Sequence, residues 1–183
     1  TDLQVHSPRD AGWDGARPDD ALASEASAED RKLVREKYCK EFIEKCIENG
    51  LTAASITDHH EGIYVYDALR VLGEMREADP ALDFWLFPGM ELTCKDSWQA
   101  LIIFDGNLAQ NLFEKARSKL GLPTDVRPDE KQGIQVELLI YNIEELQQLL
   151  DSDDELRGRF IILPHVKPDG HKTVLRRGFH KRF

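Results

Sequence analysis

Four short stretches, far apart along the chain, place histidine, carboxylate or amide side chains at or just beyond the end of an apolar run. These stretches cover residues 2–7, 56–60, 87–91 and 161–165. One histidine at a strand end says little, but four strands that end in this way predict a single site at one rim of a sheet or barrel. In α/β folds, ligands gather at the carboxyl ends of the strands. The pattern therefore constrains both the fold and the position of the site.

Apolar runs and helical patterns alternate between these stretches. Strands are expected at residues 2–7, 51–57, 84–92, 100–104 and 160–166, with the third interrupted or ended at Pro88 and Gly89. Helices are expected at residues 27–49, 66–78, 107–120 and 142–157, while residues 133–141 are ambiguous. Ser27 and Asn142 are the predicted N-caps of the first and last helix. This alternation favours an α/β fold with a mostly parallel sheet, and 183 residues suit a single domain.

The charge balance limits the kinds of partner. A net charge of −10 makes the chain a poor bulk binder of nucleic acid, because most of that affinity comes from neutralised phosphates. The segment 167–182 is basic, however, and two interpretations stay open: a local phosphate-binding edge or a solvated basic helix. No long apolar run predicts a membrane span. Three cysteines without a Cys-x-x-Cys pair favour a reducing compartment, so a cytoplasmic protein is expected.

The residue types within the four stretches favour metal binding. Imidazole nitrogen and carboxylate oxygen together suit Zn, Mn or Fe better than Ca. Alternation along a strand directs Gln4 and His6 to the same face, and Pro164 marks a strand end that places His165 at the rim. For each residue alone, a polar cap at a strand end is the alternative. The sequence contains no nucleophile-elbow, P-loop or Gly-x-Gly-x-x-Gly motif.

The ordered set resembles the PHP (polymerase and histidinol phosphatase) domain family. The motifs are Gln-Val-His at 4–6, Thr-Asp-His-His at 57–60, Pro-Gly-Met-Glu at 88–91 and Leu-Pro-His at 163–165. They look most like PHP domains fused to large AAA or SMC-like ATPases. The resemblance implies a distorted (β/α)7 barrel. Because only five or six strands are recognisable, residues 1–183 are expected to form one PHP-like domain that lacks its C-terminal strands.

The resemblance also implies a metal centre of two or more divalent ions, with Mn, Zn or Fe as candidates. The expected metal-binding residues are His6, Asp58, His59, Glu91 and His165. Glu91 is a candidate bridge between ions, and Asp58 a candidate to orient His59. Asp10 and Asp14 are both candidates for a further polar ligand, and His60 is an extra ligand or proton shuttle.

The chain departs from the family pattern at three points. Gln4 and Gln99 stand where the family has histidines, and no closing Asp-x-His motif is present. These departures predict either a reduced metal set or the loss of catalysis.

The function implied by the resemblance is that of a metal-dependent phosphoesterase, with nucleic acid as substrate and a fused or associated ATPase as partner. The expected catalytic residues are His59, His165, His171 and Arg9, with Lys167 and Lys172 as further phosphate-binding candidates. Two alternatives stay open. One is a phosphatase acting on small molecules. The other is a degenerate scaffold that regulates or docks an ATPase.

Overall fold

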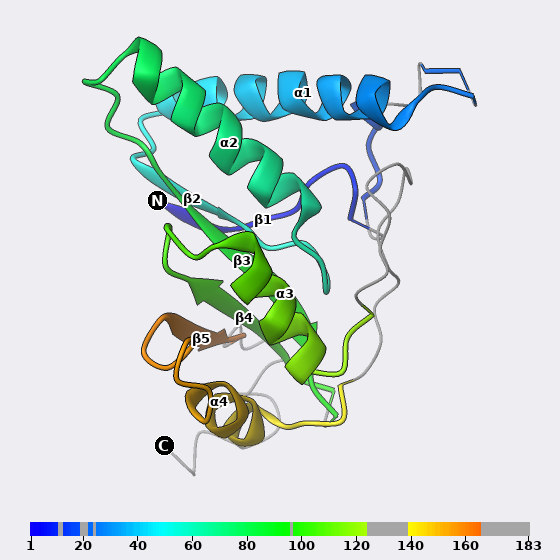
Figure 1. Ribbon diagram of the computed structural model, residues 1–183, viewed down its shortest axis with the longest axis vertical. Helices are drawn as coiled ribbons and strands as arrows, with labels where there is room; N and C mark the ends of the chain where they lie inside the picture. The colour runs from blue at the N-terminus through cyan, green and yellow to red at the C-terminus, as the bar shows by residue number, and fades with distance from the viewer. Residues whose placement is uncertain (11–12, 19–21, 24, 96, 124–138, 166–183) are drawn as a thin grey trace.

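The computed structural model describes residues 1–10, 13–18, 22–23, 25–95, 97–123 and 139–165. Within these ranges, the chain forms five strands and four helices, which alternate as far as β3 (Figure 1). In order they are β1 (Asp2–Val5), α1 (Ala28–Glu48), β2 (Ala53–Ile56), α2 (Ile63–Ala78), β3 (Trp85–Thr93), β4 (Gln99–Phe104), α3 (Gln110–Lys119), α4 (Ile143–Asp151) and β5 (Phe160–Pro164). The predicted α/β class is confirmed.

The five strands form one mixed sheet in the order β1-β2-β3-β4-β5. The pairs β1–β2 and β2–β3 are parallel, whereas β4 is antiparallel to both β3 and β5. Because two reversals restore the original direction, β5 runs the same way as the first three strands. The carboxyl ends of β1, β2, β3 and β5 therefore lie at one rim of the sheet, together with the start of β4.

The sheet is open among the described residues, with β1 and β5 at its edges. The (β/α)7 barrel implied by the resemblance is not seen in this part of the chain. No helix in the described ranges is long and apolar enough to cross a membrane.

Local sequence signals explain the helix boundaries. Ser27 and Asn142 cap α1 and α4 as predicted, each in a capping box with the residue three positions later, Asp30 or Glu145. Helix α4 ends at Asp151, earlier than expected, and a series of turns leads to β5.

Strand β3 continues through Pro88 and Gly89 instead of ending there. Pro88 pairs with Ile56 at the last position of β2. A Cβ on Gly89 would lie 2.8 Å from Ser55 Oγ and 3.0 Å from the Ile102 carbonyl. Glycine therefore allows β3 to lie between its two neighbours at this point.

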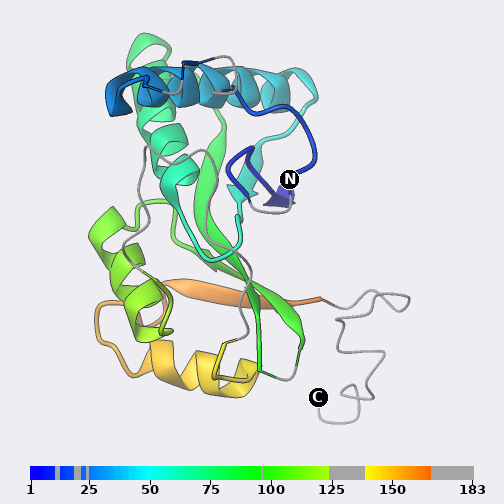
Figure 2. The same ribbon diagram turned by 90° about the vertical axis from the view of Figure 1, so that its right-hand side faces the viewer.

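The helices and one face of the sheet form the core. One buried cluster joins the sheet to α3 and α4 and includes Met90, Leu92 and Ile102. A second joins the sheet to α1 and α2 and includes Ala54 and Leu86. Helices α1 and α4 lie at opposite ends of the long axis, with the strands between them (Figures 1 and 2). Since successive strand residues point to opposite faces, Glu91 points away from Met90 and Leu92, toward the other face.

Candidate metal centre

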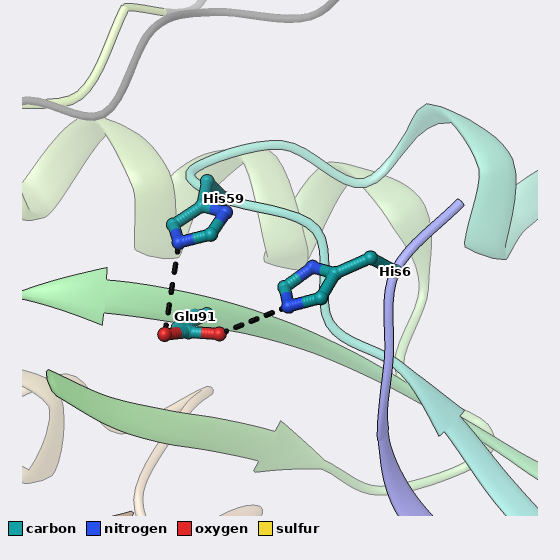
Figure 3. A group of neighbouring side chains, drawn as sticks. All are labelled: His6, His59 and Glu91. Atoms are coloured by element: carbon teal, nitrogen blue, oxygen red, sulfur yellow. Dashed lines mark ion pairs between the residues drawn. The ribbon is translucent and has the colours of Figure 1, made fainter. Parts of the chain in front are cut away.

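Glu91 is the residue on which the predicted site side chains converge. Its carboxylate lies 3.1 Å from His6 Nε2, 3.6 Å from His59 Nε2 and 3.9 Å from His165 Nε2. Figure 3 shows the rings of His6 and His59 directed at the carboxylate from two different segments. The prediction that the four motifs share one rim is therefore confirmed as geometry, whereas the role of these residues as metal ligands stays a prediction.

The sheet topology explains this convergence. His6 follows β1, His59 follows β2, and His165 follows β5, so each lies just beyond the carboxyl end of a strand that points to the same rim. His59 forms an isolated parallel bridge with Glu91, and the Glu91 amide donates to the Asp58 carbonyl. The backbone thus fixes the loop after β2 beside β3.

Asp10 lies on the other side of the two imidazole rings. Its Oδ2 is 2.8 Å from His59 Nδ1 and 3.2 Å from His6 Nδ1, and it also accepts the His59 backbone N–H at 2.8 Å. Because a carboxylate can only accept, His59 donates its Nδ1–H to Asp10, whereas the His6 Nδ1 contact with Asp10 is an ion pair without hydrogen-bond geometry; Nε2 of both rings is directed at Glu91. Such a carboxylate fixes the tautomer and orientation of a metal-binding histidine.

The geometry resolves the choice between Asp10 and Asp14 and reassigns the role expected for Asp58. Asp14 is exposed, whereas Asp10 is buried against both rings. Asp58 is buried too, but its two oxygens accept hydrogen bonds of 2.6 Å from the Ser7 backbone and hydroxyl. Asp10 therefore orients His59, and Asp58 holds the segment after β1 against the segment after β2.

The pKa values of the two histidines and the two carboxylates are shifted in opposite directions. Hydrogen bonds to Asp10 and Glu91 raise the pKa of His6 to about 10. Burial lowers the pKa of His59, but hydrogen bonds to the same two carboxylates outweigh it and raise it to about 9. Burial raises the pKa of Asp10 and Glu91, but hydrogen bonds from the histidines lower both well below the usual range. Two buried carboxylates thus stay ionised and attract positive charge.

A second, fully buried pair lies beside the site. Arg9 Nε is 2.7 Å from Glu61, and both side chains are at most 1% exposed. Burial raises the pKa of Glu61 to about 7, against the opposing effect of Arg9. The expected role of Arg9 in binding a phosphate stays a prediction, but this placement favours a structural role in holding residues 7–10 on the loop after β2.

His60 has a structural environment that differs from that of its neighbour. It is 0% exposed and adopts a left-handed backbone with φ of 62°. Arg117 of α3 donates to its carbonyl at 2.8 Å and also donates to the Pro123 carbonyl. The ring of His60 stands edge-on to that of His59 at 6.3 Å. The bend at His60 therefore separates the site from the start of α2.

Two glutamines complete the rim. Gln4 Nε2 donates to Glu91 Oε2 at 3.0 Å and lies 3.3 Å from His165 Nε2, and Gln99 Nε2 lies 3.4 Å from His59 Nε2. Both glutamines that stand where histidines were expected are therefore part of the site. His171, Lys167 and Lys172 lie outside the described residues.

The donor atoms fit a divalent transition metal. Ligand atoms of His6, His59 and Glu91 lie within 4.8 Å of one another, as do those of His6, Asp10 and Asp58. Ligand atoms about 2.0–2.2 Å from one ion lie roughly 3–4.4 Å apart, which matches the separations around Glu91. The first group also has Asp10 behind both rings. It is therefore the better metal site.

Sequence reasoning did not assign the roles of Asp10, Ser7 and Glu61. The sequence signal for the role of Asp10 was its close spacing to His6, because a turn between them brings the carboxylate back toward the ring. The structure has this turn: the Asp10 amide donates to the Ser7 carbonyl at 2.9 Å.

Comparison with known proteins adds no family. No protein-family model matches the chain, and no curated protein matches it either. The resemblance to PHP domains therefore rests on the sequence motifs alone.

Proposed function

We propose that this protein is a metal-dependent phosphoesterase whose catalytic ion is held by His6, His59 and Glu91. The observation that carries the proposal is the pair of imidazole rings between two buried carboxylates, with each Nδ1 facing Asp10 and each Nε2 facing Glu91. When bound, a divalent ion would lower the pKa of a water molecule toward neutrality and polarise a phosphoryl oxygen.

The chain's own residues supply orientation around that position. Asp10 faces Nδ1 of both rings, so Nε2 is the nitrogen of each ring that an ion would bind. Asp58, through Ser7, and Glu61, through Arg9, hold the segment that carries His6 against the loop that carries His59. His165, half-buried beside Glu91, is placed to accept or release a proton at Nε2. Under this proposal these groups need little rearrangement when a substrate phosphate binds, which is favourable for catalysis.

A nucleic-acid phosphodiester is the proposed substrate, and an associated ATPase the proposed partner, in the cytoplasm. This part of the proposal follows from the resemblance to ATPase-fused PHP domains. The sheet face from which Glu91 projects is not covered by a described helix (Figure 2), which favours a long substrate, although the Glu91 carboxylate itself is buried. A small-molecule phosphatase would require a more enclosed site.

A degenerate scaffold is the second candidate function, and the two glutamines favour it. Their amides already contact Glu91, His165 and His59. If these contacts replace metal binding altogether, the site is a hydrogen-bonded polar cluster with a structural role and no catalytic activity.

One assay separates the candidates. Metal-stripped protein is supplemented with Mn, Zn or Fe and tested on an aryl phosphate diester, an aryl phosphate monoester and single- and double-stranded DNA. The proposal predicts metal-dependent cleavage of the diester and DNA that His59→Ala abolishes. Cleavage of the monoester alone supports the small-molecule phosphatase. The absence of both metal binding and cleavage supports the scaffold.

A further inference from the structure

The amide nitrogen of Gln4 contacts two groups of the site. Nε2 lies 3.0 Å from Glu91 Oε2 and 3.3 Å from His165 Nε2. A carboxylate only accepts hydrogen bonds, so the amide must present nitrogen, not oxygen, to Glu91. The same nitrogen faces His165 Nε2, which accepts the second hydrogen in the tautomer that carries its proton on Nδ1. The lone pairs of Glu91 and His165 therefore converge on one electropositive group.

The Gln4 amide group therefore lies between a carboxylate and an imidazole lone pair. A cation could bind these two ligands if the amide were absent. Glu91 Oε1 and His165 Nε2 are 3.9 Å apart. Two ligands of one ion at about 2.0–2.2 Å can be separated by up to roughly 4.4 Å, so an ion could join them without a change in the backbone. The Gln4 amide nitrogen, a neutral donor, lies beside this position, against the other oxygen of Glu91 and against His165 Nε2.

The same contact leaves both histidines of the proposed catalytic ion directed at Glu91, although Gln4 Nε2 and His6 Nε2 lie against the same oxygen, Glu91 Oε2, at 3.0 Å and 3.1 Å. His6 and His59 approach Glu91 from the loops after β1 and β2, whereas His165 follows β5 at the opposite edge of the sheet. Asp10 supports only the first two rings. The two positions are thus unequal, because Asp10 supports the pair His6 and His59, whereas His165 faces the Gln4 amide.

We infer that Gln4 limits the centre to one ion by obstructing a second cation position between Glu91 and His165. This inference rests on the proposed function, because it assumes an ion at His6, His59 and Glu91. Gln4 would then determine how many ions the site binds. The expected number is one, fewer than the two or more ions predicted from the sequence. It also leaves His165 as a proton-transfer group in place of a ligand.

The test is metal stoichiometry, which does not depend on activity. Metal-stripped protein is dialysed against Mn²⁺, and bound metal is measured by mass spectrometry. Wild type is expected to bind one ion per chain. Gln4→Ala removes the amide and is expected to bind two, with an exchange-coupled Mn pair in its electron paramagnetic resonance spectrum. Gln4→His, which supplies an imidazole at the same place, is expected to bind the second ion more tightly.

Two controls make the result specific. The double variant Gln4→Ala/His165→Ala is expected to return to one ion, because the second position loses its imidazole. Gln147→Ala, which changes an exposed glutamine on α4, is expected to stay at one. Since Gln4 is itself exposed, its replacement leaves the core intact, and circular dichroism checks that each variant is folded.

The remaining outcomes overturn the inference, and they separate it from the proposed function. One ion in both wild type and the Gln4 variants, or two in wild type, overturns the role of Gln4 alone. Two ions in the double variant contradict His165 as the ligand of the second position. Wild type that binds no metal overturns the proposed function and the inference with it.

Discussion

The imidazole rings of His6 and His59 stack 5.0 Å apart and only 5° from parallel, although the residues follow different strands. Two histidines with raised pKa values would repel each other if they stood alone. Asp10 and Glu91 offset this repulsion, because each carboxylate faces both rings. The arrangement places two Nε2 atoms on the same side, as a shared ion requires.

Asp10→Asn tests the support behind the rings. An amide can present its N–H to Nδ1 and favour the wrong tautomer, so we expect the dissociation constant for Mn²⁺ to rise about 10–100-fold. Asp14→Asn, an exposed neighbour, is the matched control and should leave affinity unchanged. Calorimetric titration measures both, and equal affinity in the two variants would contradict the role given to Asp10.

The stability of the metal-stripped protein should fall as the pH rises. The pKa values of His6 and His59 are raised from 6.5 to about 10 and about 9, so their stabilisation is complete below about pH 6.5 and is lost toward pH 9–10. The lowered pKa values of Asp10 and Glu91 add stability that is lost only in acid. Burial raises the pKa of Asp58 and Glu61, which also favours the lower pH.

Melting temperatures between about pH 5 and pH 9 measure this effect. The maximum should lie near pH 5–6.5 for stripped protein. Because an ion replaces the protons on the two rings, the increase in melting temperature caused by Mn²⁺ should grow with pH. A stripped protein whose melting temperature is flat or rising from pH 6.5 to 9 would refute the assigned proton positions.

Arg9→Met separates a structural arginine from a phosphate-binding one. Removal of one partner from a buried ion pair leaves the Glu61 carboxylate uncompensated, and we expect a loss of about 3–5 kcal/mol in the free energy of unfolding. Arg157→Met changes an exposed arginine and should cost less than about 1 kcal/mol. Urea unfolding measures both. If Arg9→Met retains full stability but binds substrate weakly, Arg9 is a substrate-binding residue.

Gly62→Ala tests the packing that places the loop after β2. A Cβ at Gly62 would lie 2.4 Å from Phe113 Cε1, in the core between α2 and α3. We expect a loss of about 1–3 kcal/mol from overpacking. In the double variant Gly62→Ala/Phe113→Leu the cost of the alanine should be smaller, and strictly additive effects would argue against the contact. Gly73→Ala, with open space at its Cβ, is the control.

The sequence predicted the element order and the convergence of His6, His59, Glu91 and His165, because strand ends in an α/β fold are fixed by apolar runs and caps. It did not predict that β3 continues through Pro88, since this depends on the end of the neighbouring strand β2. It also could not choose Asp10 over Asp14, because that choice depends on a turn whose hydrogen bond to Ser7 is visible only in three dimensions. The contacts of Gln4 and Gln99 likewise required the folded rim.

Crystals of the protein soaked in Mn²⁺ and measured for anomalous scattering provide the most direct test of the proposed metal centre. The account predicts an anomalous peak about 2.0–2.3 Å from His6 Nε2, His59 Nε2 and the Glu91 carboxylate, with Asp10 hydrogen-bonded to both Nδ1 atoms. A peak located instead between Asp10 and Asp58, or the absence of any peak at this rim in crystals soaked to saturation, would contradict it.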